Sequence, residues 1–359
     1  MKIGFVMDSC IVCGGTLIPF QYVRELKKRG YDADVFANAT AIESYAPTRP
    51  VSEIDTFNSY DRIIAVWWPQ CDELFKFQGK KIQFVQGNDM LANVGEGRKQ
   101  RCLHIRQDTH WDIMSVSRYS GEWVGRRGYG IVPNFVDSRF LQDLKLKRDI
   151  DILIEGNDES NKNIEQTIEI AKMMKAKKIV WLGRETHPIE GIEVITNPPQ
   201  ADIPSIYQRA KIFLKLSKTE GFCLPLIEAM ASKCLCVTQD MGGNDYCEFG
   251  KNCLSVGEST KDREDIIEAG YQTALNHSIE NSTDKLIEYL KTMKIKTKPN
   301  QVTITTDTQV VADHLTEYLQ ELESAMNRGY GKVTSTVHED YLILEVEKKS
   351  RKKRNRFST

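Results

Sequence analysis

Residues 212–240, IFLKLSKTEGFCLPLIEAMASKCLCVTQD, constrain the fold more than any other part of the chain. The apolar run from Ile212 to Leu216 predicts a strand, SKTEGF a loop, PLIEAMASK a helix and CLCVT a second buried strand. Two such strands joined by a helix form a βαβ unit, which is typical of a parallel sheet covered by helices.

The start of the predicted helix has the properties of an anion site. Pro225 suits the first helical position, because its missing N–H is one that the helix leaves unpaired anyway. Three backbone N–H groups are then expected to point back toward the loop and to attract an anion, those of Cys223, Leu224 and Leu226.

Two carboxylates bracket this predicted anion site. Glu220 precedes the helix and Glu228 follows its first turn. Carboxylates accept hydrogen bonds from sugar hydroxyls, so the arrangement suits a diphosphate with a sugar at each end, which is a nucleotide-sugar. An ordinary βαβ crossover with two solvated acids would give the same spacing.

Length and charge limit the other possibilities. A chain of 359 residues suits two α/β domains, and 49 basic against 50 acidic residues do not indicate a nucleic-acid partner. No apolar stretch approaches the ~18 residues of a membrane helix, and the first predicted strand begins at Lys2. We therefore expect a cytoplasmic protein whose nine cysteines are reduced.

Strands and helices alternate through the first half of the chain. Predicted strands cover 2–7, 31–37, 61–68, 81–86, 112–117 and 130–134, and a helix runs from about Thr16 to Arg29 with Pro19 in its first turn. Such alternation predicts a doubly wound parallel sheet with its ligand beyond the carboxyl ends of the strands. Gly14 and Gly15 would let backbone approach a ligand there, although a tight turn alone would also explain them.

Other residues at strand ends or in loops are weaker candidates. They are Trp67, Trp68, Gln86, Asn88, Asp89, His104 and His110. A tryptophan could stack on a sugar, but adjacent strand residues face opposite sides, so one of the pair is expected in the core. The histidines are candidate bases or ordinary surface residues. Cys10 and Cys13 form the only C-x-x-C, between a predicted strand and a predicted helix, which is where a redox motif would lie. Gly14 and Gly15 separate the pair from the helix start, and no second pair completes a zinc site.

A second series of strands and helices follows the connector 135–149. Predicted strands cover 151–156, 177–183 and 191–196, and predicted helices cover 162–175, 203–209, 264–275, 282–293 and 308–326. The α/β chain thus divides into Rossmann-like domains 1–140 and 141–305, which are expected to face a cleft, and a terminal helix within 306–328. Region 329–359 contains a predicted hairpin, KVTSTV and DYLILEVE, and a basic tail.

The segment 220–256, EGFCLPLIEAMASKCLCVTQDMGGNDYCEFGKNCLSV, resembles the signature of retaining glycosyltransferases of the GT-B fold, family 4 (glycosyl transferases group 1). Two glutamates separated by seven residues and a following Gly-Gly carry the resemblance. Supporting matches are Gly14-Gly15, MSVSRYS, IVPNFVD and SIYQRAKIFLKLS, in order over about residues 1–256. The resemblance implies an acceptor-side N-terminal domain and a C-terminal domain that binds the nucleotide-sugar. It also implies a terminal helix that crosses back to the N-terminal domain, for which 308–326 is the candidate.

By position, the resemblance implies that Glu220 contacts hydroxyls of the donor sugar and Glu228 those of the ribose. Lys162 matches the basic residue that neutralises the leaving phosphates. The diphosphate would be held by backbone at Gly221, Phe222, Cys223 and Leu224 together with Gly14 and Gly15. The resemblance implies no metal and no other cofactor.

Two positions depart from the family pattern. Asn157 follows Gly156 where the family usually has an arginine, so this contact to the leaving group is missing or comes from elsewhere, with Arg184 as the candidate. Losing a charged donor costs about 2 to 4 kcal/mol of transition-state stabilisation. Gln86 stands where many members have a histidine; it can form hydrogen bonds but cannot shuttle a proton.

The implied reaction moves a sugar from a nucleoside diphosphate sugar to a hydroxyl of a glycan or lipid-linked acceptor, with retention of configuration. Three alternatives stay open. A glycosidase also uses paired carboxylates, Asn157 suggests a non-catalytic nucleotide-sugar binder, and an epimerase of the same fold is the third.

The chain ends in a dense basic run, KKSRKKRNR at 348–356. Such a run is usually a solvated tail. The alternative is contact with an anionic membrane surface, which would suit a lipid-linked acceptor.

Overall fold

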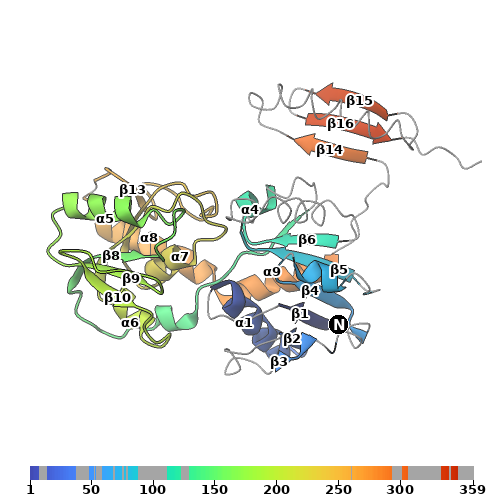
Figure 1. The fold of residues 1–359 in the computed structure, drawn as a ribbon, viewed down its shortest axis with the longest axis horizontal. Coiled ribbons are helices and arrows are strands. Elements are labelled where there is room, and N and C mark those ends of the chain that lie inside the picture. Colours follow the sequence, from blue (N-terminus) through green and yellow to red (C-terminus); the bar gives the residue numbers. More distant parts are fainter. Residues whose placement is uncertain are drawn as a thin grey trace, which may run out of the picture. The chain divides into compact units, whose positions relative to one another are not determined.

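The computed structural model describes residues 1–7, 14–37, 48–51, 53, 59–67, 69–74, 77, 80–87, 111–122, 129–259, 261–292, 301–305, 333–338 and 341–346. The chain forms two compact units, which are described separately. The first unit spans 1–124 and 129–292 and holds two parallel sheets; the second comprises 125–128 and 293–359 and holds an antiparallel sheet (Figure 1).

The N-terminal sheet has seven parallel strands in the order β3-β2-β1-β4-β5-β6-β7. The strands are β1 (Lys2–Val6), β2 (Asp32–Phe36), β3 (Thr48–Arg49), β4 (Arg62–Ala65), β5 (Lys80–Val85), β6 (Trp111–Ser115) and β7 (Gly130–Ile131), and the helices are α1 (Gly14–Lys28), α2 (Gln70–Glu73) and α4 (Arg118–Glu122). β7 is shorter than predicted, since Pro133 lacks the N–H that a continuing ladder needs.

The C-terminal sheet has six parallel strands in the order β10-β9-β8-β11-β12-β13. The strands are β8 (Ile150–Glu155), β9 (Ile179–Gly183), β10 (Glu193–Thr196), β11 (Ala210–Lys215), β12 (Leu235–Thr238) and β13 (Leu254–Ser255). The helices are η3 (Ser138–Leu141), α5 (Ile164–Met173), α6 (Ile203–Gln208), α7 (Leu224–Ala231) and α8 (Arg263–Asn276). The predicted pair of Rossmann-like parallel sheets is therefore present.

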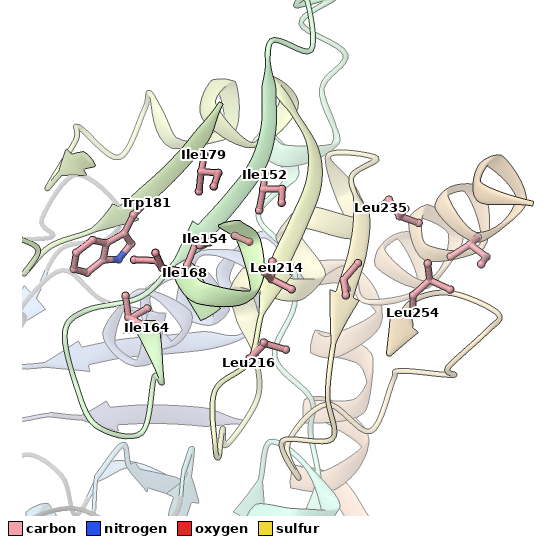
Figure 2. Close-up of a cluster of buried hydrophobic side chains, with 13 residues drawn as sticks. Ile152, Ile154, Ile164, Ile168, Ile179, Trp181, Leu214, Leu216, Leu235 and Leu254 are labelled. Atoms are coloured by element: carbon pink, nitrogen blue, oxygen red, sulfur yellow. The ribbon is translucent and has the colours of Figure 1, made fainter. Parts of the chain in front are cut away.

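One face of the C-terminal sheet packs under α5. Figure 2 shows Ile152 and Ile154 of β8 beside Leu214 of β11, with Ile164 and Ile168 of α5 in the same buried cluster. Alternate strand residues point to opposite faces, so the intervening residues of β8 and β11 lie on the other face of the sheet.

Helix α9 (Ile279–Thr292) packs against α1 of the N-terminal domain. Arg29 donates to the carbonyl of Glu280 at 3.0 Å, and Arg62 donates to that of Leu290 at 3.4 Å. This segment was predicted to belong to the C-terminal domain, and 308–326 was the helix predicted to cross back. Residues 308–326 lie outside the described residues, and it is α9 that returns to α1.

The second unit contains a three-stranded antiparallel sheet in the order β14-β16-β15, with β14 at Gln301–Thr305, β15 at Val333–His338 and β16 at Tyr341–Val346. The predicted hairpin is confirmed, since His338 pairs with Tyr341. The third strand, β14, was not predicted. Residues 348–356 lie outside the described part of the chain.

Candidate active site

A cavity of about 420 Å³ lies where loops from both parallel sheets meet. Its lining includes every predicted site residue except Gly221 and Cys223; these residues are Gly14, Gly15, Gln86, Asn157, Lys162, Arg184, Glu220, Phe222, Leu224 and Glu228. Most of them follow the carboxyl end of a strand, which is where ligands of parallel α/β sheets bind. Residues far apart in the sequence therefore form one site.

Glu220 lies in this site between two lysines. Lys162 Nζ contacts its two carboxylate oxygens at 2.9 and 3.0 Å, and Lys215 Nζ lies 3.6 Å from Oε1. Burial alone would raise the pKa of Glu220, but the attraction of Lys215 and Lys162 outweighs it and lowers the pKa. The carboxylate is therefore ionised and fixed in place.

Lys162 is not in a helix, contrary to the prediction that a helix begins there. Helix α5 begins at Ile164, because Asn163 adopts a left-handed conformation with φ of 56° and donates from Nδ2 to the carbonyl of Leu216 at 3.0 Å. The turn directs the side chain of Lys162 toward Glu220, although the two residues are 58 positions apart in the sequence.

The predicted anion site at the start of α7 is only partly formed. The N–H of Leu224 donates to the carbonyl of Phe222 at 2.8 Å, and that of Leu226 donates to Cys223 at 3.2 Å. The prediction that both amides are free is therefore wrong, because a tight first turn uses them internally. Helix α7 begins at Leu224, so Pro225 is its second residue.

Comparison with known proteins gives a family match for part of the chain. Residues 138–252 match the model of the family described as glycosyl transferases group 1. The predicted resemblance to glycosyl transferases group 1 is confirmed over this segment. No curated protein is similar in sequence.

Solved structures of similar fold include Anabaena Alr3699/HepE in complex with UDP and glucose, at 14% identity and a TM-score of 0.69, covering 82% of this chain and 100% of that one. A glycosyltransferase from Rickettsia africae ESF-5 is 14% identical with a TM-score of 0.64, covering 81% and 97%. Sucrose-phosphate synthase from Thermosynechococcus elongatus is 12% identical with a TM-score of 0.57, covering 90% and 99%. The predicted GT-B fold is confirmed.

Asn157 organises a turn beside the cavity. Its Oδ1 accepts from the backbone N–H of Arg184 at 3.0 Å, and its Nδ2 donates to Glu159 at 3.2 Å. An amide has no charge to offer a phosphate, so Asn157 acts here by fixing the backbone from which Arg184 extends. Both residues line the cavity.

Gln86 connects β5 to the first helix. Helix α1 begins at Gly14 rather than Thr16, so Pro19 lies beyond the first turn, contrary to the prediction. Pro19 has no N–H, so it cannot donate the helical hydrogen bond to the carbonyl of Gly15, four residues earlier. Gln86 Nε2 donates to this carbonyl instead, at 2.9 Å. Within the described residues, Gln86 Oε1 is buried and has no hydrogen-bond partner.

The loop of Gly221 is held by the N-terminal domain. Ser117 Oγ donates to the Gly221 carbonyl at 2.6 Å and Ser120 Oγ at 3.2 Å. A Cβ on Gly221 would lie 2.0 Å from the carbonyl oxygen of Gln86, so the two loops approach as closely as glycine permits. The contact was not predicted, although the segment MSVSRYS that contains both serines was singled out.

Lys215 and Glu155 were not predicted as site residues. Lys215 is the last residue of β11, and its side chain is 2% exposed. A lysine inside the apolar run IFLKLS was the available signal, since buried lysines are rare unless they are paired. The run was interpreted only as a strand.

The remaining candidates from the sequence are Trp67 and residues that the structure does not describe. Trp67 is 48% exposed and does not line the cavity. The others lie outside the described residues: Cys10, Cys13, Trp68, Asn88, Asp89, His104 and His110. Among the described residues, no group of three or more His, Cys, Asp or Glu could hold a metal ion. The described helices also include none that is long and apolar enough to cross a membrane.

Glu228 of α7 has the opposite electrostatic environment to Glu220. Burial, followed by repulsion from Glu155 and Asp137, raises its pKa to about 8. Attraction from Arg139 and Lys215 opposes this shift only partly. Glu228 is therefore protonated at neutral pH, and its carboxyl can donate as well as accept a hydrogen bond.

The raised pKa of Glu228 predicts a pH dependence of stability. The unfolded carboxyl has a pKa of about 4.3, so between this value and 8 the folded state holds a proton that the unfolded state has lost. The free energy of unfolding should fall as the pH rises through this window, by about 1.4 kcal/mol for each pH unit. We expect Glu228→Gln to remove this decline and to be more stable than the wild type at pH 9.

Urea unfolding at pH 5 and pH 9 measures the effect. Glu169→Gln, an exposed glutamate on α5, is the control and should keep the wild-type decline. Parallel pH profiles of Glu228→Gln and wild type would show that Glu228 is ionised in the folded protein.

Proposed function

We propose that the protein is a metal-independent retaining glycosyltransferase of family 4, which transfers a sugar from a nucleoside diphosphate sugar to a hydroxyl acceptor. The observation that carries the proposal is the ion pair of Lys162 and Glu220 at the cavity. A cation for phosphate and a carboxylate for sugar hydroxyls lie side by side there, which is the pair that a sugar diphosphate needs.

Each side chain would have a distinct part in the transfer. Lys162 turns from Glu220 to the diphosphate and neutralises the charge that develops as the sugar leaves, and Arg184 adds a second cation at the cavity rim. Glu220 accepts hydrogen bonds from the sugar and orients it, without forming a covalent intermediate. Gln86 Oε1, which has no hydrogen-bond partner among the described residues, is the proposed acceptor for a hydroxyl at the N-terminal side.

The proposed donor is a uridine diphosphate sugar. The support comes from Anabaena Alr3699/HepE, which has the same fold and whose structures contain UDP, UDP with glucose, and UDP-glucose. In this chain the protonated Glu228 is the proposed partner of the ribose hydroxyls. The acceptor would be a glycan or a lipid-linked glycan that enters from the side of Gln86.

A thermal-shift screen tests the choice of nucleotide. UDP should raise the melting temperature more than GDP, ADP, CMP or dTDP at equal concentration, because a ligand that binds only the folded state stabilises it. Incubation with the matching sugar donor and a panel of glycan acceptors should then release UDP and give a product with the anomeric configuration of the donor. Product of inverted configuration would refute the retaining mechanism.

A non-catalytic nucleotide-sugar binder is the second candidate, and Asn157 favours it, since one cation of the family pattern is absent. The same screen separates the two functions. Stabilisation by UDP without UDP release across the acceptor panel would support the binder. Release with water as the sole acceptor would indicate a hydrolase instead.

A further inference from the structure

The side chain of Lys215 lies beneath the candidate active site rather than in it. Leu214 and Leu216 belong to the cluster under α5 (Figure 2), so Lys215 projects from the opposite face of β11. Its Nζ contacts Glu155 Oε2 at 2.9 Å and the Glu155 carbonyl at 2.8 Å. Glu155 ends the neighbouring strand β8, next to the paired residues Ile154 and Leu214.

Glu155 and Lys215 hold one another at the ends of two adjacent central strands. A buried ammonium needs an anionic partner, and Glu155 supplies it with both a carboxylate and a carbonyl oxygen. The Lys215 ammonium is thereby fixed 3.6 Å from Glu220 Oε1. Because the Lys215 side chain is only 2% exposed, its ammonium is shielded from solvent.

The two lysines beside Glu220 differ in what they can reach. Lys162 is 23% exposed and lines the cavity, whereas Lys215 does not line it. A diphosphate in the cavity would therefore compete with Glu220 for Lys162 and could not attract Lys215 away. Glu220 would then keep one cation, the buried one.

We propose that Lys215, locked by Glu155, is a positioning residue that keeps Glu220 ionised and oriented toward the donor sugar while Lys162 is engaged by the diphosphate. The inference rests on the proposed glycosyl transfer. It also explains why an ammonium is retained in an otherwise apolar strand: its counter-charge is divided between Glu155 and Glu220.

The charges around Glu220 decide what a test must control. Four titratable groups, from the loop before α5, from β11 and from the segments before α7 and after β12, act on Glu220 or are acted on by it: Lys162, Lys215, Cys223 and Tyr246. Glu155 of β8 acts on Lys215. Removing Lys215 alone would leave Glu155 without its partner and risk unfolding. Both members of the pair must therefore be replaced together.

The decisive variant is Glu155→Leu/Lys215→Met, because an apolar pair of similar volume often replaces a buried ion pair without loss of stability. We expect it to fold and to show the wild-type rise in melting temperature with UDP. Its kcat should fall about tenfold or more, with a KM for the donor close to that of the wild type. The acidic limb of its pH–rate profile should move to higher pH by about one unit, since Glu220 loses a cation within 4 Å.

Two further variants complete the design. Glu155→Gln/Lys215→Gln keeps a hydrogen bond between the strands without either charge, and it carries the same expectations if the apolar pair does not fold. Lys211→Met is the matched control, since Lys211 pairs with Asp151 at 2.7 Å near the opposite ends of the same strands. It should leave kcat and the acidic limb unchanged.

A folded double variant with wild-type kcat and an unmoved acidic limb would overturn the proposal, and so would a raised KM with unchanged kcat. A second readout does not depend on activity. NMR titration of ¹³C-labelled glutamate carboxyls with UDP bound, assigned with Glu220→Gln, should show a pKa for Glu220 that is below its ordinary value in the wild type and higher in the double variant. If the wild type transfers no sugar, the proposed function fails while this titration still tests Lys215.

Discussion

Glu220→Gln is expected to abolish sugar transfer while nucleotide binding persists. The amide keeps the shape of the side chain but loses the charge that pairs with Lys162 and Lys215. A neutral amide accepts hydrogen bonds from sugar hydroxyls less strongly than a carboxylate and cannot stabilise positive charge that develops on the ring. We expect kcat to fall by about 100-fold or more, by analogy with the loss of one pre-organised electrostatic contact.

The measurement is UDP release in the presence of donor and acceptor, beside the thermal shift that UDP alone produces. Nucleotide binding should survive or become tighter in Glu220→Gln. The variant lacks the ion pair between Lys162 and Glu220, which competes with the diphosphate for Lys162. The exposed Glu169→Gln is the control and should match the wild type in both assays. Undiminished transfer by Glu220→Gln would remove Glu220 from the mechanism.

The sequence predicted the parallel sheets well because their strands are continuous apolar runs. Runs such as Ile152 to Ile154 are buried on both faces, so hydrophobicity alone marks them. The family resemblance then brought Lys162 and Glu220 into one site. Periodicity could not have joined residues that lie 58 positions apart.

The sequence failed where one contact depends on a distant partner. Pro19 was assigned to a first turn, because the sequence does not show that Gln86 serves the carbonyl that proline leaves unpaired. Lys215 was included in a strand, because its partner Glu155 is separated from it by 60 residues. The amides of Leu224 and Leu226 were predicted to be free, because the sequence does not show how tightly the first turn of a helix is wound.

Gly221→Ala should damage the site from a position that contributes no side chain to it. The added Cβ would lie 2.0 Å from Gln86 O and 2.5 Å from Gly87 Cα. Both are backbone atoms and cannot rotate away, so the loop after Glu220 must move. We expect the displacement to destabilise the fold by roughly 1 to 3 kcal/mol.

The same displacement should affect transfer more than nucleotide binding. The carbonyl of Gly221 would lose its hydrogen bonds from Ser117 and Ser120, and Glu220, one residue earlier, would shift relative to both lysines. A misplacement of about 1 Å in a reacting constellation can lower the rate by about 100-fold. Melting temperature and UDP release together measure the two effects.

Gly87→Ala is the matched control for Gly221→Ala, since it adds a methyl group on the opposite side of the same contact. A Cβ on Gly87 meets no atom within 4 Å, and the backbone there does not need a left-handed conformation. This variant should keep the wild-type melting temperature and rate. If both alanines behaved alike, the close approach of the two loops would not matter for transfer, and Glu220 would have to be held in place by its lysines alone.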